Sequence, residues 1–361
     1  MHYRYVDIVR GIAAFSILIW HYQHFFYPAA GIPPPLMLRE HLPFYDWLFP
    51  FYRHGGNAVQ LFWVLSGFVF AVVYIERPVT GWMFFVNRFA RLYPLHLATL
   101  ALVALLQIVS LNTLGHYQIY GHNDTYHFFL NLFMVQKWGF EAGYSFNAPT
   151  WSVSVEVAIY AFFFHTLLLL RRASLLGGLL LVTISYTLQM ITAPGNFIEC
   201  AMFFYLGTSC YAIVRRSPLF ALALGSHALV VFLVLRWIDG QGALAKHEMI
   251  ALFSGIILIA AALDRLRPIH SNRYDWLGNA TYGTYLVHVP IQMAFLVTVQ
   301  NNEWDQNTIA GQGVCLVSFV TLAFAIGVAI HKWFELPLKQ SIKSFLLGPG
   351  PEESSRLHQA R

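Results

Sequence analysis

Apolar runs long enough to cross a lipid bilayer recur along the whole chain, and they limit what it can fold into. A spanning helix needs about 20 mostly apolar residues. The composition agrees, because 57% of the 361 residues are apolar and only 11% are charged, against about 25% charged in a soluble domain. We predict an all-α, polytopic membrane protein of about ten transmembrane helices, at residues 7–27, 57–76, 89–112, 151–170, 174–191, 197–214, 218–238, 248–264, 279–300 and 308–334.

The basic residues predict the orientation of these helices, because Lys and Arg accumulate in short cytoplasmic loops. With the N-terminus inside, the outer side holds five of the 22 Lys and Arg, which leaves 17 on the inner side. We therefore expect both termini in the cytoplasm and a multi-pass protein of the cytoplasmic (inner) membrane. The net charge of +5 then reflects topology, and no basic patch of the kind that binds nucleic acid is evident.

The chain is predicted to form one membrane domain, residues 1–345, followed by a disordered cytoplasmic tail, residues 346–361, that is polar and begins with Gly and Pro. The apolar piece at 126–138 is too short to span. The two longest outer loops, 28–56 and 113–150, are expected to form a partly ordered cap over a cavity. Three cysteines without metal-ligand spacing predict neither a disulfide framework nor a metal site.

Polar residues inside spans are the first place to seek function, because an ionisable side chain in hydrocarbon is costly. On the first predicted helix, Asp7, Arg10, His21 and His24 fall within about a quarter of the circumference. Arg10 and His21 are eleven residues apart, which is about 16 Å along one face. His21 is thereby placed near the middle of the bilayer. The alternative is a structural histidine that a neighbouring helix satisfies.

Two other spans carry polar groups at a compatible depth. Glu156 is the one carboxylate predicted deep in a span, about five residues in from Trp151, an expected outer interfacial anchor. His288 shares a helix face with Tyr285, although it is equally compatible with a packing role. Ser66, followed by a glycine, predicts close helix approach and is a supporting residue.

Arg88 and Arg91 are three residues apart at the inner end of the third predicted helix, so they project from one face. Their guanidinium groups suit phosphate, and Arg10 is close to them in the predicted topology. The alternative is that both arginines are topological anchors.

Several short motifs, in this order, resemble the acyltransferase 3 family of integral membrane acyltransferases. They are VDIVRGIAAFSILIWH, LFWVLSGFVF, RFAR, PTWSVSVE, TYGTYLVHVPI and KWFELPLK, and the resemblance spans the whole chain. It implies a ten-helix domain that moves an acyl group, most often acetyl from acetyl-CoA, to a hydroxyl of an extracytoplasmic sugar. It also implies that His21 is essential and that Arg10, Arg88 and Arg91 serve the CoA. Val157 departs from the family, since many relatives have a second Glu there.

The predicted function is therefore that of a stand-alone O-acetyltransferase, like those that modify exopolysaccharide, lipopolysaccharide or nodulation factors. Acyl-CoA is the donor substrate, no cofactor is bound, and the acceptor is a carbohydrate or glycolipid. His21 is expected to act as general base and Glu156 to orient the imidazole or the sugar. Direct transfer is favoured, and a transient acyl group on His21 is the alternative. The competing class is a proton-coupled transporter or flippase, which would have internal repeats that the sequence lacks.

Overall fold

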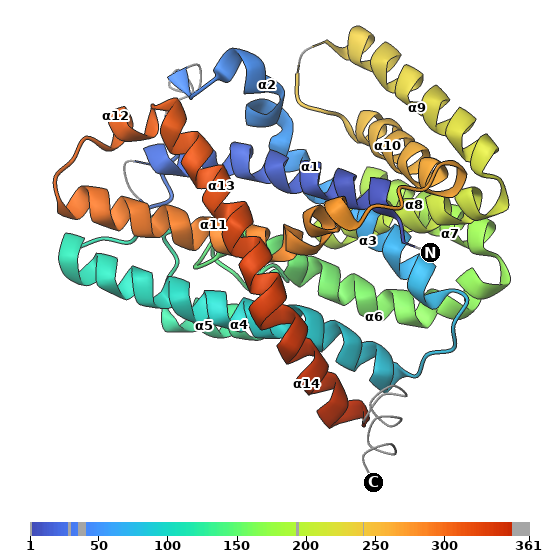
Figure 1. The fold of residues 1–361 in the computed structure, drawn as a ribbon, viewed down its shortest axis with the longest axis horizontal. Coiled ribbons are helices and arrows are strands. Elements are labelled where there is room, and N and C mark those ends of the chain that lie inside the picture. Colours follow the sequence, from blue (N-terminus) through green and yellow to red (C-terminus); the bar gives the residue numbers. More distant parts are fainter. Residues whose placement is uncertain (1, 28–29, 35–40, 193–194, 241, 349–361) are drawn as a thin grey trace.

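The computed structural model describes residues 2–27, 30–34, 41–192, 195–240 and 242–348, and within these ranges the chain is built of helices with no β-strands (Figure 1). Long helices packed side by side make up the body of the molecule. The α-helices are α1 (Arg4–His21), α2 (Tyr45–His54), α3 (Ala58–Tyr74), α4 (Gly81–Leu114), α5 (Thr125–Leu132), α6 (Trp151–Arg172), α7 (Ser174–Ile191), α8 (Asn196–Arg216), α9 (Pro218–Asp239), α10 (Lys246–Leu266), α11 (Asp275–Asn301), α12 (Gln306–Ala310), α13 (Gly313–Ile330) and α14 (Leu336–Leu347).

Nine helical segments in the described ranges are long and apolar enough to cross a membrane. The prediction of an all-α, polytopic membrane protein is thus confirmed, with one difference at the first span. Helix α1 is not among the nine, because its 18 residues include three charged side chains near the start. It also ends at His21, six residues before the predicted end, and the chain continues as a 3₁₀ helix over Tyr22–Phe26.

The C-terminal part of the domain differs from the prediction in two places, where the last span begins and where the predicted tail begins. The last span begins at Gly313, and a π-helical turn over His331–Glu335 joins α13 to α14. Figure 1 shows the two helices as one long rod that crosses α11 and α4. Helix α14 extends to Leu347, which is inside the predicted tail. The rest of that tail, 349–361, lies outside the described residues.

Glycines let two pairs of helices approach closely. A Cβ atom on Gly67 of α3 would lie 1.7 Å from the carbonyl oxygen of Phe204 on α8, and one on Gly207 of α8 would lie 1.9 Å from that of Val64. Helices α11 and α13 cross in the same way at Gly327. Because such distances are impossible for a side chain, only glycine permits this packing. The predicted close approach at Ser66-Gly67 is therefore present.

Candidate active site

A cavity of about 460 Å³ lies within the bundle, among α1, α3, α4, α6, α11 and α14. Along α3 its lining extends from Val59 to Tyr74, which is about 22 Å of helix. One end, here called the basic end, is lined by Arg88, Arg91, Lys339 and Lys343; the opposite end, here called the histidine end, reaches Tyr285 on α11. The remaining lining residues include Arg10, Ser66, Ser152, Glu156, Tyr160 and Thr281.

At the basic end, Arg88 is held by aromatic rings. Its guanidinium carbon lies 4.5 Å from the ring centroid of Phe70 and 5.5 Å from that of Tyr74, and both distances are typical of cation–π contacts. Its buried Nε has no hydrogen-bond partner among the described residues. The side chain is therefore held in place while part of its donor capacity remains free for a ligand.

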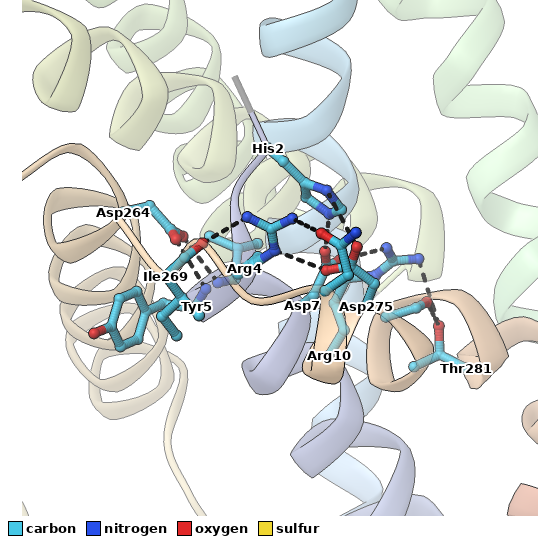
Figure 2. A network of polar contacts seen from close by, with 12 residues as sticks. His2, Arg4, Tyr5, Asp7, Arg10, Asp264, Ile269, Asp275 and Thr281 are labelled. Atoms are coloured by element: carbon cyan, nitrogen blue, oxygen red, sulfur yellow. Dashed lines mark hydrogen bonds and ion pairs between the residues drawn. The ribbon is translucent and has the colours of Figure 1, made fainter. Parts of the chain in front are cut away.

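Arg10 is positioned by a network at the start of α1 (Figure 2). Its guanidinium donates to Asp7 at 3.1 Å and, at 3.4 Å, to the hydroxyl of Thr281 on α11. Nearby, Arg4 forms an ion pair with Asp275 at 2.8 Å, and Asp264 of α10 accepts the backbone N–H groups of residues 5 and 6. A carboxylate at a helix N-terminus satisfies otherwise unpaired donors. Helices α1, α10 and α11 are thus tied together at the depth of Arg10.

Glu156 lies between the two ends of the cavity. The side chain is 7% exposed, and its Oε1 has no hydrogen-bond partner among the described residues. It lies beside the hydroxyl groups of Ser66 and Tyr160 and within electrostatic reach of Arg88 and Arg91. Glu156 is about one turn along α6 from Ser152, on the side away from the histidine end, so it is closer to the middle of the cavity than to His21.

Tyr285 and Ser152 close the histidine end. The Tyr285 hydroxyl donates to the carbonyl oxygen of Pro149 at 2.5 Å and lies 2.9 Å from the Ser152 hydroxyl. Pro290 lies inside α11, five residues after Tyr285. A proline leaves the carbonyl four residues earlier without its helical partner, and the Asn147 side chain donates to that carbonyl, of Leu286, at 2.9 Å.

Three histidine rings lie close together, at tilted angles, about one turn beyond Tyr285. The ring centroid of His21 is 4.8 Å from that of His288 and 4.9 Å from that of His24. His288 is fully buried, and its Nδ1 lies 2.6 Å from the Tyr285 carbonyl oxygen. Because a carbonyl oxygen only accepts, the proton of neutral His288 is assigned to Nδ1. Its Nε2 and the Nδ1 of His21 have no partner among the described residues.

His24 is oriented by Gln292 of α11. The Gln292 amide donates to the His21 carbonyl at 2.7 Å, and its oxygen lies 3.0 Å from His24 Nδ1. Because the Gln292 amide oxygen only accepts, the proton of neutral His24 is assigned to Nδ1. His24 Nε2 then accepts from the Tyr120 hydroxyl, which lies 3.3 Å away. The prediction that the α-helix continues through His24 to residue 27 is wrong, because α1 ends at His21 and a 3₁₀ helix follows. The 3₁₀ turn instead places His24 against His21.

The loop 113–150 covers the histidines through Tyr120. Helix α5 belongs to this loop and is only eight residues long, so the apolar piece at 126–138 does not span. Asp124 caps α5 by accepting the backbone N–H of His127 at 2.9 Å. That hydrogen bond holds the pKa of the exposed Asp124 carboxyl below its usual value. The described part of this loop is therefore ordered by its own polar contacts.

The predicted site residues thus form two groups. Arg10, Arg88, Arg91, Ser66, Glu156 and Tyr285 all line the cavity. Among the described lining residues there is no His21, His24, His288 or Trp151, and Trp151 instead packs edge-on against Trp63 at 5.9 Å. Sequence reasoning missed Lys339, Lys343 and Tyr160. Lys339 and Lys343 are four residues apart on the predicted cytoplasmic side, but nothing in the sequence indicated that they line the same cavity as Arg88.

The fold and this cavity define a polytopic membrane protein with a cationic internal chamber that ends beside a group of three histidines. A family model described as an acyltransferase domain matches residues 3–328. The chain therefore belongs to the acyltransferase 3 family.

Two relatives match parts of the chain. The acyltransferase MdmB of Streptomyces mycarofaciens is 36% identical over 115 residues, which are 30% of this chain and 27% of that protein. Protein 2 in the picA locus of Rhizobium radiobacter is 36% identical over 103 residues, which are 27% of this chain and 42% of that protein. The match covers less than half the length of either relative. No solved structure matches the chain.

Proposed function

We propose that the protein is an O-acyltransferase of the cytoplasmic (inner) membrane with both termini in the cytoplasm. It takes an acyl group, in the first instance acetyl, from acyl-CoA bound at the basic end of the cavity. It delivers that group to a hydroxyl of an extracytoplasmic carbohydrate or glycolipid near His21.

The observation that carries this proposal is the course of the cavity. It begins at four cationic side chains and ends at Tyr285, whose ring centroid is 5.7 Å from that of His288. An acyl-CoA has the same polarity along its length, with phosphates at one end, a slender pantetheine arm, and a thioester at the other end. Phosphates bound by guanidinium groups would direct the thioester toward the histidines.

In this proposal His21 acts as general base. The acceptor hydroxyl transfers its proton to a ring nitrogen of His21 as its oxygen attacks the thioester carbonyl carbon. The carbon–sulfur bond then breaks, and the CoA sulfur leaves as a thiolate that takes the proton from the imidazolium. The products are an O-acyl ester and free CoA. Because Glu156 lies near the middle of the cavity, we assign it to orienting the bound substrate rather than the imidazole.

The proposal is tested with purified protein in lipid nanodiscs, by measuring acetyl-CoA binding and the release of free CoA thiol in the presence of a panel of lipid-linked and soluble glycans. We expect His21→Ala to lower thiol release by about 10²–10⁴-fold and to leave acetyl-CoA affinity within about twofold, because the basic end is several turns away. Arg88→Ala and Arg91→Ala should instead weaken binding.

Two results would overturn the proposal. One is folded wild-type protein that binds no acetyl-CoA. The other is a folded His21→Ala variant that transfers acyl groups at the normal rate, which would return the histidines to a structural role.

A further inference from the structure

Helix α14 brings a second pair of cations to the cavity. Lys339 and Lys343 are four residues apart, so they lie on one face of α14, and both line the basic end with Arg88 and Arg91 of α4. Each lysine is partly buried. Neither residue belongs to the arginine pair that the sequence assigns to the donor.

The packing of α14 on α4 determines the depth of the two lysines. The indole N–H of Trp82, at the start of α4, donates to the carbonyl oxygen of Leu346, near the end of α14, at 3.2 Å. The two helices are in contact, and this hydrogen bond joins the start of one to the end of the other. Lys339 is therefore near the depth of Arg88 and Arg91, and Lys343 is about one turn closer to the start of α4.

The four cations outnumber the carboxylates described near them, which are Glu156 and Glu335. None of them forms an ion pair with a described residue. Arg91, Lys343 and Arg88 are the positive groups that act on Lys339, and Glu335 is the carboxylate within its reach. Glu335 already bonds the ring of His331 at 3.0 Å. Four clustered cations repel one another unless an anion joins them, so the arrangement favours a ligand with more than one phosphate group.

We propose that Lys339 and Lys343 form a second phosphate subsite, which binds the phosphate monoester at the adenosine end of CoA, while Arg88 and Arg91 bind the pyrophosphate. This inference rests on the proposed use of acyl-CoA. The lysines lie farther from the histidine end than Arg10 and Glu156 do. The phosphate monoester is at the nucleotide end of CoA, far from the thioester, so a thioester at the histidine end would leave the monoester near the lysines. A phosphate monoester carries nearly two charges, and lysine ammonium groups on flexible stems suit such a compact anion.

The matched control is Lys332, which lies on the π-helical turn next to α14. Its side chain is exposed, its ammonium lies 5.8 Å from the ring of Trp333, and it does not line the cavity. Lys332→Ala therefore removes one basic charge from the same part of the molecule without touching the proposed subsite.

The test compares the binding of CoA and of dephospho-CoA, which lacks the monoester, to the full protein in phosphatidylcholine nanodiscs. We expect wild-type protein and Lys332→Ala to bind CoA about 10–100-fold more tightly than dephospho-CoA, as hydrogen bonds to charged groups allow. In the double variant Lys339→Ala/Lys343→Ala the ratio of CoA affinity to dephospho-CoA affinity should fall to about one, and the dephospho-CoA affinity itself should be nearly unchanged. The double Lys→Arg variant should keep most of the preference.

Three outcomes would overturn the subsite. The first is equal affinity of wild-type protein for CoA and dephospho-CoA. The second is a double Ala variant that still prefers CoA as strongly as wild-type protein does. The third is a loss of CoA affinity in the double Ala variant that appears only in nanodiscs with anionic phospholipid. The last result would assign the lysines to lipid headgroup phosphates. If folded wild-type protein binds neither nucleotide, the proposed donor is wrong as well, which distinguishes the two failures.

Discussion

The ring of His288 is enclosed by protein, yet only one of its two nitrogens forms a hydrogen bond with the part of the chain that the structure describes. Nδ1 donates to the carbonyl oxygen of Tyr285, and Nε2 has no hydrogen-bond partner among the described residues, although the ring centroid lies 4.8 Å from that of His21. A buried acceptor without a partner costs free energy, and such groups in native proteins call for an explanation. We propose that His288 is a positioning residue whose Nε2 accepts a hydrogen bond from the Nδ1–H of His21 during the reaction, which leaves the other His21 nitrogen available as the base.

Replacing His288 with Ala should lower the rate of thiol release by about tenfold or more and leave acetyl-CoA affinity within about twofold. The pH–rate profile should also shift, because His21 loses its neighbour. His227→Ala is the control, since His227 is exposed on α9. A His288→Ala protein with unchanged rate and pH profile would show that His288 only packs.

At the scale of elements, the crossing of α3 and α8 positions one wall of the cavity. Gly67 and Gly207 face the opposite helix at distances that exclude any Cβ atom. Ser66, the residue before Gly67, lines the cavity beside Glu156. The same close packing that brings the two backbones together therefore determines where the Ser66 hydroxyl points.

Gly67→Ala should prevent normal packing of α3 on α8, with a loss of stability of several kcal/mol, about 3 or more, that is typical of severe overpacking. Thermal unfolding in detergent, followed by size-exclusion chromatography, would measure it. Gly81→Ala is the matched control, because a Cβ there would lie 3.5 Å from the Phe164 ring, an ordinary contact. Equal stability of the two variants would contradict the close crossing.

At the scale of the whole molecule, the start of α1, the end of α10 and the start of α11 meet in one polar network (Figure 2). Arg4, Asp7, Arg10, Asp264 and Asp275 supply its charges. Such a concentration of charge is expected at a membrane boundary rather than inside hydrocarbon. The excess of Lys and Arg on the same side assigns this boundary to the cytoplasm in our prediction.

Reporter fusions test this topology. Fusions after His41 and after Asn123 should be active only with reporters that function outside the cytoplasm, and a fusion after Arg172 only with a cytoplasmic reporter. The opposite pattern would reverse the orientation of the domain and move the basic end to the outer side, where CoA is absent.

The sequence by itself determined the membrane class, the positions of most spans and the residues Arg10, Arg88 and Arg91 around the basic end. It could do so because hydrocarbon length, loop charge and helical periodicity are local properties of the chain. Only the tertiary structure decided that His24 lies against His21, that Glu156 faces Ser66 and Tyr160, and that α14 adds two lysines to the site. The position of His24 depends on a 3₁₀ turn, that of Ser66 beside Glu156 on the glycine crossing, and that of the α14 lysines on a π-helical turn. Packing between segments far apart in the sequence determines where each of these features places its side chains.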